Sequence, residues 1–340
     1  MEREECIMCI LYVTDPAAQL RKAGGQFVVC REQDVLARIP LEKLEGVVLF
    51  GGVQASAQVL TTLLQRGVST LWLSRKGGYY GRLQPALQQD DAACQRKQFR
   101  LSEDGPWRLA LAKNLVDAKL HNSITLVRRY ARKLSQPLLV KAAEEMQLLR
   151  EKAAQASSLE ALLGIEGSAA RVYFQGFPKM LPGGFAFAGR SRRPPRDPVN
   201  SLLSFGYFLV LQELHSFLAQ RGLQPYVGFL HKERKGHPAL ASDLLEEWRP
   251  VLVDSLVLSL LWGNRLREEH FLPPDARGGV YLREDGRRLF LNAYEERLNR
   301  ESGYGGRTIS YREALRQQVL ALHRAVLEEK TAYYKPFVIR

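Results

Sequence analysis

The hydrophobic pattern of the chain changes between residues 85 and 100, and this change limits what the chain can fold into. Before it, short apolar runs alternate with Gly-containing turns, which is typical of strands. After residue 96, apolar residues recur at helical spacing over long segments, as they do on packed helices. We therefore predict an α+β protein, with a small N-terminal β-sandwich-like domain at residues 1–90 and a larger all-α domain at residues 96–340.

Each part has its own predicted elements. In the first part we expect a helix at residues 57–65 and strands at residues 7–13, 27–30, 35–39, 44–50, 68–73 and 79–83. In the second part we expect helices at residues 107–134, 137–156, 158–177, 198–220, 293–300 and 311–331. A short β-like insertion is expected at residues 279–281 and 288–291, with a turn at Asp285 and Gly286.

Basic residues outnumber acidic ones by 49 to 36, which leaves a net charge of +13. Such a surplus favours an anionic partner, nucleic acid before membrane. The helix at residues 107–134 adds positive charge, as a solvated face or a DNA-facing stripe, through Lys113, Lys119, Arg128, Arg129, Arg132 and Lys133. The Gly- and Pro-rich segment 178–197 is either a linker or a loop that holds phosphates, through Arg190, Arg192, Arg193 and Arg196.

The sequence also bears on compartment. It has no apolar run of the roughly 18 residues that a membrane span needs, and its N-terminus lacks the features of a signal peptide. We therefore expect a cytoplasmic protein with no membrane partner. Cys6 and Cys9 form a C-x-x-C pair, but residues three apart on a strand face opposite sides of the sheet. We expect reduced, structural cysteines, including Cys30 and Cys94, and the pattern assigns no role to Cys6 and Cys9.

Residues 226–254 bring an imidazole close in sequence to several carboxylates. His231 ends an apolar segment, and a basic turn follows it. In the next predicted helix, Asp243, Glu246 and Glu247 lie within one arc, because a helix advances about 100° per residue. Imidazole nitrogen together with carboxylate oxygen suits a divalent cation such as Mn²⁺, Mg²⁺ or Zn²⁺.

Two further features extend this candidate site. Glu166 lies among small residues, which would let a ligand or another backbone approach closely. Lys232 and Lys235, in the basic turn, are candidate contacts to DNA phosphates. The alternative is that acidic residues at helix starts complement the helix dipole and that the histidine is an ordinary polar loop residue.

Several longer segments carry a more specific signal. They are LARIPLEKLEGVVLFGGVQASAQVL and VSTLWLSRKGGYYGRL in the first part, and LLGIEGSAARVYFQGF, RRPPRDPVNSLLSFGYFLV, GFLHKERKGHPALASDLLEEWRPVLVD and the closing KPFVIR in the second. In this combination the chain resembles the CRISPR-associated integrase of the spacer-acquisition module, the first-numbered Cas protein family. The resemblance spans the whole length and agrees with a β part followed by a basic helical part.

The resemblance implies a set of site residues. One divalent metal, Mn²⁺ or Mg²⁺, would be bound by Glu166, His231 and Glu246, which would be the catalytic residues. Asp243, one turn before Glu246, would be an auxiliary acid of the same site. Asn200, in the matching P-V-N-S-L-L segment, would orient the structure near it.

The resemblance also implies a function. The protein would be a metal-dependent DNA endonuclease and integrase that inserts short foreign DNA fragments, called spacers, into a CRISPR array by attack of a 3′-hydroxyl on a phosphodiester. It would act as a homodimer, formed through the N-terminal β domain, and join the second-numbered Cas adaptation protein in a heterohexamer on double-stranded DNA. An adaptation nuclease, fused or associated, is a further partner. The rivals are a general metal-dependent nuclease on branched DNA or RNA, and a non-catalytic DNA-binding scaffold.

Overall fold

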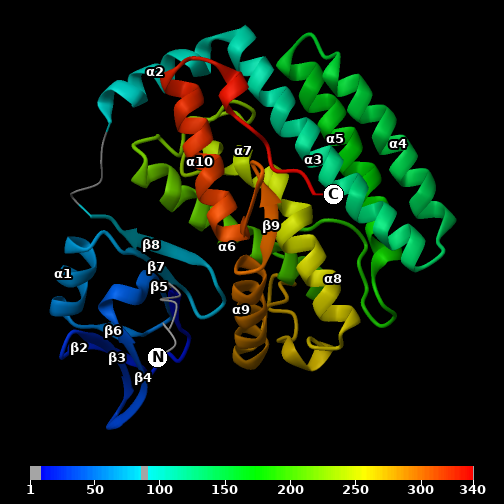
Figure 1. Cartoon of the computed structure of the whole chain (residues 1–340). Helices are drawn as coiled ribbons and strands as arrows, with labels where there is room; N and C mark the ends of the chain where they lie inside the picture. The colour runs from blue at the N-terminus through cyan, green and yellow to red at the C-terminus, as the bar shows by residue number, and fades with distance from the viewer. Residues whose placement is uncertain (1–8, 86–90, 340) are drawn as a thin grey trace. The chain divides into compact units, whose positions relative to one another are not determined.

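The computed structural model describes residues 9–85 and 91–339, and the chain separates into two compact units at residues 1–88 and 89–340 (Figure 1). The first unit is β-rich and the second is mainly helical, as the change in periodicity predicted. The two units are described separately below.

The first unit contains two four-stranded sheets. One sheet has the order β1-β5-β7-β8, with β8 antiparallel to β7 and the other pairs parallel, and consists of Cys9–Val13, Leu44–Phe50, Ser69–Leu73 and Tyr79–Leu83. The other sheet has the order β4-β3-β2-β6 and consists of Asp34–Pro40, Gln26–Arg31, Gln19–Ala23 and Gln54–Ala55. The parallel pairs explain why β5 reads as a continuous apolar run, since parallel strands are covered on both faces.

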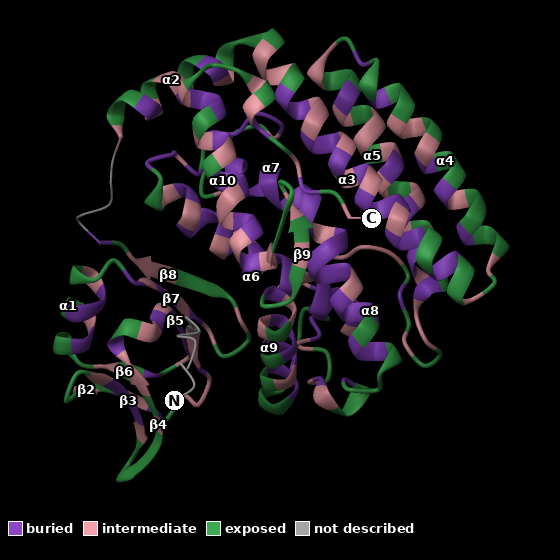
Figure 2. Cartoon of the chain, viewed as in Figure 1, coloured by how far each residue is buried: buried purple, intermediate pink, exposed green. Residues whose placement is uncertain are grey.

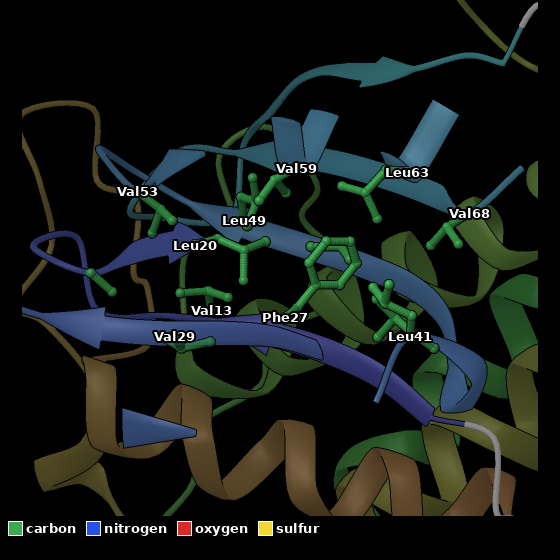
Figure 3. Close-up of a cluster of buried hydrophobic side chains, with 13 residues drawn as sticks. Val13, Leu20, Phe27, Val29, Leu41, Leu49, Val53, Val59, Leu63 and Val68 are labelled. Atoms are coloured by element: carbon green, nitrogen blue, oxygen red, sulfur yellow. The ribbon is translucent and has the colours of Figure 1, made fainter. Parts of the chain in front are cut away.

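Side chains from both sheets and from α1 (Ala57–Gln65) share one core. Leu20 and Phe27 of one sheet pack with Leu49 of the other and with Val59 and Leu63 of α1 (Figure 3). The helix begins where the sequence predicts, because the Ser56 side chain accepts a hydrogen bond from the backbone N–H of Val59. This unit is therefore the predicted sandwich-like domain, with the predicted helix packed into its core.

The second unit is built on nine described helices. They are α2 (Ala92–Glu103), α3 (Gly105–Lys133), α4 (Pro137–Ala154), α5 (Leu159–Gly176), α6 (Pro198–Gln220), α7 (Ala239–Trp248), α8 (Ser255–Trp262), α9 (Glu284–Leu298) and α10 (Tyr311–Leu327). The long helices α3, α4 and α5 lie side by side, and α3 also packs against α7 (Figure 1). These contacts bring α5 and α7, which are distant in sequence, onto the same helix.

Burial in this unit follows the helical pattern. On α3, Leu115 and Val127 are buried whereas Arg128 and Arg129 are exposed, as an amphipathic helix requires. Buried and exposed stretches alternate along this helix (Figure 2). Every residue of α7 is buried. The described helix α6 is long and apolar enough to cross a membrane by length and composition alone, but 61% of its apolar window is buried within the protein.

The predicted β-like insertion at residues 279–281 and 288–291 is wrong. Residues 288–291 and the expected turn at Asp285 and Gly286 lie in α9, because Phe290, Leu291 and Tyr294 bury one face at helical spacing. A hairpin occurs later instead, where β9 (Glu301–Tyr304) pairs with β10 (Arg307–Ser310). The helix predicted at residues 293–300 is the C-terminal part of α9.

Among the described cysteines, Cys30 and Cys94 are free thiols, as predicted. Cys94 is fully buried, and burial together with the charge of Asp91 raises the pKa of its thiol to about 11. Cys6 lies outside the described residues.

Candidate active site

A cavity of about 350 Å³ in the second unit is lined by side chains from α3, α5 and the segment that includes α7. Lys119 comes from α3, Glu166 from α5, and Glu246 from α7, while His231 comes from the loop before α7. The packing of α3 against both α5 and α7 positions these groups. The three predicted metal ligands therefore line one cavity.

The two carboxylates meet at a single lysine. The Lys119 ammonium pairs with Oε1 of Glu166 and lies 2.5 Å from Oε2 of Glu246. Lys119 is 12% exposed and Glu246 only 4%, so these charges interact largely out of water. Their burial strengthens the pairing relative to an exposed ion pair.

Glu246 is surrounded by three basic side chains. Its other oxygen, Oε1, lies 2.9 Å from Nη2 of Arg249 and 3.8 Å from Nε2 of His231. Burial alone would raise the pKa of Glu246, but the charges of Arg249, Lys119 and His231 lower it to about 2. Glu246 Oε2 is buried and has no well-formed hydrogen bond, so this oxygen is directed at a cation and not at a neutral donor.

His231 is held by Asp243. Its Nδ1 lies 2.7 Å from Asp243 Oδ1, so Nδ1 donates to the carboxylate, and whenever the ring is neutral Nε2 is the acceptor toward the cavity. Asp243 also accepts backbone N–H groups of Phe229, Leu230 and His231. Burial lowers the pKa of His231, but the hydrogen bond and charge of Asp243 outweigh it and raise this pKa. Asp243 therefore orients the histidine and does not line the cavity itself.

The positions of the acidic residues remove the helix-dipole explanation. Glu166 lies two turns inside α5, and neither Asp243 nor Glu246 is in the first turn of α7. The dipole effect is confined to the first turn of a helix. Only some of the small residues beside Glu166 shape the site. Ala169 and Ala170 line the cavity, whereas Gly167 faces open space.

Glu247 departs from the predicted carboxylate face. It accepts hydrogen bonds from the Tyr334 hydroxyl, the Gln318 side-chain amide and the backbone N–H of Phe337. Its side chain is fully buried, and burial outweighs these three donors and raises its pKa to about 8. Glu247 therefore binds the C-terminal segment and belongs to the fold.

A polar wall continues the cavity beyond Glu246. The buried carboxylate of Asp254 accepts hydrogen bonds from the hydroxyls of Tyr173, at 2.6 Å, and Tyr207, at 2.5 Å. Burial raises the pKa of Asp254 to about 6, despite these donors and the nearby Arg249. The Arg249 guanidinium lies 4.8 Å from the centre of the Tyr207 ring and links this wall to Glu246.

Apart from Arg190, the predicted DNA-binding residues separate into two groups. Arg192 and Lys232 are exposed and line the cavity, together with Arg234. Arg193, Arg196 and Lys235 are exposed but lie outside the cavity wall.

Arg190 differs from the other arginines of its segment. Its guanidinium donates to Asn200 Oδ1 at 2.6 Å and to Ser204 Oγ at 3.0 Å, so it is used to fold the loop. Asn200 also accepts from the backbone N–H of Ser191 and donates to the carbonyl of Gly189. Asn200 thus orients the local structure, as the resemblance implied, and Arg190 is not free for a phosphate.

Sequence reasoning missed three residues of the site. Lys119 was assigned to the basic stripe, although its spacing from Leu115 and Asn122 places it on the buried side of α3. Arg249, three residues after Glu246, was not singled out. Gly228 was also missed: a Cβ there would lie 2.8 Å from Asp243 Oδ2, so only glycine lets the loop wrap around that carboxylate.

The ligand atoms of Glu166, His231 and Glu246 do not all lie within 4.8 Å of one another. Among the described residues, the group whose ligand atoms all lie within 4.8 Å of one another is Asp91, Cys94 and His323, and the predicted triad is not such a group. In that group, Asp91 caps α2 by accepting two backbone N–H groups, and the Cys94 thiol stays protonated.

Comparison with known proteins gives a consistent family. A family model described as CRISPR associated protein Cas1 matches residues 11–296. A Thermus thermophilus protein named CRISPR-associated endonuclease Cas1 3 is 40% identical over 338 residues, which is 97% of each chain. A Geobacter sulfurreducens protein named CRISPR-associated exonuclease Cas4/endonuclease Cas1 fusion is 37% identical over 337 residues, which is 95% of this chain and 59% of that one.

Solved structures share the fold. A chain in a structure titled Cas6-RT-Cas1--Cas2 complex has a TM-score of 0.82 at 25% identity, over 99% of this chain and 37% of that one. A structure titled Casposase bound to integration product has a TM-score of 0.81 at 21% identity, over 95% of this chain and 92% of the other. Since the family model and the relatives both match most of its length, the chain belongs to the Cas1 family of CRISPR-associated endonucleases.

Proposed function

We propose that this protein is a metal-dependent DNA endonuclease and integrase that inserts short foreign DNA fragments into a CRISPR array. The observation that carries the proposal is the meeting of Glu166 and Glu246 at one cation position, beside an imidazole whose Nε2 faces the same cavity. Exposed cations on the cavity wall suit a phosphodiester partner. The names of the relatives as endonucleases support the hydrolytic half of this activity.

The donor set fits a divalent metal. Glu246 Oε2 is a buried oxygen without a well-formed hydrogen bond, and Glu166 and His231 supply one carboxylate and one imidazole beside it. The Asp243 carboxylate on Nδ1 of His231 is the usual arrangement behind a metal-binding histidine. We therefore propose Glu166, His231 and Glu246 as ligands of Mn²⁺ or Mg²⁺. When bound, such an ion lowers the pKa of an attacking hydroxyl and neutralises charge on the phosphoryl oxygens.

Other residues of the chain would orient the histidine and bind the DNA backbone. Asp243 keeps His231 in one tautomer and one orientation, so that its acceptor nitrogen faces the cavity. Arg192 and Lys232 would hold the DNA backbone without reading its sequence. Tyr207 and Asp254 also line the cavity, where the Tyr207 hydroxyl donates to the Asp254 carboxylate.

The proposed partners rest on the family resemblance and on the names of related proteins. We propose a homodimer formed through the N-terminal β domain and a heterohexamer with the second-numbered Cas adaptation protein on double-stranded DNA. A structure titled as a Cas1--Cas2 complex contains a chain of this fold. An associated adaptation nuclease is supported by the relative named as a Cas4/Cas1 fusion.

The central test removes each proposed ligand. Glu166→Ala, His231→Ala and Glu246→Ala should each reduce strand transfer of a short DNA duplex into a repeat-containing plasmid by at least about 100-fold, while DNA binding is retained. Chelation by EDTA should stop the reaction, and added Mn²⁺ or Mg²⁺ should restore it. Glu160→Ala, at an exposed carboxylate of the same helix α5, is the matched control and should behave as the wild type.

The same assay separates the rivals. A general nuclease would cleave hairpin or branched DNA or RNA without joining ends to the repeat. A scaffold would bind DNA with no metal-dependent product. Full strand transfer by any one of the three alanine variants removes that residue from the ligand set.

A further inference from the structure

Lys119 occupies the position between the two carboxylates that a cation of the site would need. Its ammonium pairs with Glu166 of α5 and with Oε2 of Glu246 of α7, the buried oxygen that lacks a well-formed hydrogen bond. Lys119 itself comes from α3, so three helices meet at one nitrogen atom. Glu246 has a second cation in Arg249, but Lys119 is the cation that bridges both carboxylates.

The charges explain why this contact matters. Two carboxylates that share a largely buried site repel each other, and each ionised group favours a nearby cation. The Lys119 ammonium lies within ion-pair distance of both carboxylates, and its side chain is only 12% exposed. Lys119 and Arg249 together therefore balance the charges of Glu166 and Glu246 without any bound ion.

We propose that Lys119 is a built-in counter-ion of this site. It holds Glu166 and Glu246 together in the metal-free protein, and it competes with the divalent metal for the same two carboxylates. This inference rests on the proposed metal-dependent function. Because lysine is a compact charge on a flexible four-carbon stem, it can leave the carboxylates without moving α3. Lys119 is thus a positioning residue that acts through Glu166 and Glu246.

Lys119→Met tests this proposal, because methionine keeps an unbranched apolar stem and removes the charge. Without metal, Lys119→Met should unfold at a lower temperature than the wild type, since the carboxylates lose their shared cation. Isothermal titration with Mn²⁺ alone should show a Kd about tenfold lower than the wild type, which is about 1.4 kcal/mol. The metal-free unfolding temperature and the Mn²⁺ affinity are the two measurements that decide the proposal.

Lys113→Met is the matched control. Lys113 lies on the same helix but outside the cavity wall, so the substitution makes the same chemical change away from the site. It should leave both the metal-free unfolding temperature and the Mn²⁺ affinity unchanged. If Lys119→Met folds poorly, the double variant Lys119→Met with Glu166→Gln should recover metal-free stability, because one repelling charge is gone. A Mn²⁺ Kd for Lys119→Met equal to or weaker than that of the wild type overturns the proposal.

The outcomes distinguish this inference from the proposed function. If the wild type shows no Mn²⁺ or Mg²⁺ binding and no metal-dependent strand transfer, the proposed function fails. If the wild type binds Mn²⁺ and transfers strands, but Lys119→Met changes neither metal-free stability nor Mn²⁺ affinity, only the counter-ion role fails.

Discussion

At the scale of single residues, Asp243 is the carboxylate outside the ligand set that holds the His231 ring. Its two oxygens accept from three backbone N–H groups and from the His231 ring. Asp243→Asn keeps the shape but turns one acceptor into a donor that faces other donors. We expect Mn²⁺ affinity to fall about 10- to 100-fold, the usual effect of losing the partner of a metal-binding histidine.

Isothermal titration with Mn²⁺ measures this effect. Asp275→Asn is the control, since Asp275 accepts from the backbone N–H groups of Arg277 and Gly279 in a turn outside the cavity wall. Unchanged Mn²⁺ affinity in Asp243→Asn would show that the histidine is oriented by something else.

Asp254 predicts a specific dependence of stability on pH. Burial raises its pKa from the ordinary 3.8 to about 6. Its protonated form is thus favoured in the folded state: this contribution is fully present below about pH 3.8 and is lost as pH rises through 6. Between pH 4.5 and 7.5 the metal-free wild type should lose about 2 kcal/mol of unfolding free energy relative to Asp254→Asn. Urea unfolding of both proteins across this range measures the difference, and parallel profiles would contradict the prediction.

Residues differ in how far the sequence could predict them. Glu166, His231 and Glu246 were found through motifs, and the structure places all three on one cavity. Lys119 could have been found, because helical spacing places it with Leu115 and Asn122 on the buried side of α3. The partners of Glu247 could not, because they come from residues 318, 334 and 337, whose proximity only the tertiary fold decides.

At the scale of elements, the C-terminal segment fastens two helices of the site. Asn122 of α3 donates to the carbonyl of Phe337 and accepts from the N–H of Ile339. Glu247 of α7 accepts from the N–H of Phe337, and the Phe337 ring stacks on Trp248 with ring centres 4.3 Å apart. The segment therefore binds α3 at Asn122, three residues after Lys119. It binds α7 at Glu247, the residue next to Glu246.

Phe337→Ala should accordingly lower stability by about 3–5 kcal/mol, because the ring is completely buried and leaves a cavity. Its neighbour gives a control: Val338 is 43% exposed, and Val338→Ala should change stability by less than about 0.5 kcal/mol. Urea unfolding of both variants measures the difference. Similar small losses in both would mean that the segment is held by its backbone hydrogen bonds alone.

Element type was predictable wherever one periodicity dominated. Residues 57–65 form α1 as predicted, because Ser56 caps a run that buries Val59 and Leu63 on one side. The prediction for the region of α9 was wrong because the pair Asp285 and Gly286 is typical of a turn. Gly286 is packed against His270 within a helix, a contact that local sequence does not reveal.

At the scale of the whole molecule, the order of a β-rich unit and a helical unit was predictable, but strand pairing was not. The parallel pairs β1–β5 and β5–β7 join strands that lie far apart in sequence. Periodicity shows which faces are buried, and it contains no information on which strands become neighbours. The same holds for the site, where α3 meets α5 and α7 only through tertiary packing.

The surplus of positive charge makes a final prediction about DNA binding by the whole protein. With a net charge of +13, much of the affinity for DNA should come from phosphate contacts and should fall as salt rises. Arg192, Lys232 and Arg234 are exposed on the cavity wall, so their joint replacement by alanine should remove contacts near the reacting phosphate. The slope of log affinity against log salt should become shallower by about 2 to 3, since each phosphate contact contributes about 0.9.

Replacing Lys152, Arg277 and Arg307 removes the same charge from exposed positions outside the cavity wall. That control should weaken binding slightly and leave the slope nearly unchanged, because charges far from the duplex are screened beyond about 10 Å at 0.1 M salt. Fluorescence anisotropy of a labelled duplex across a salt series measures both variants. Equal slopes in the two triple variants would mean that DNA is bound by the overall charge of the protein and that the cavity wall has no special share in it.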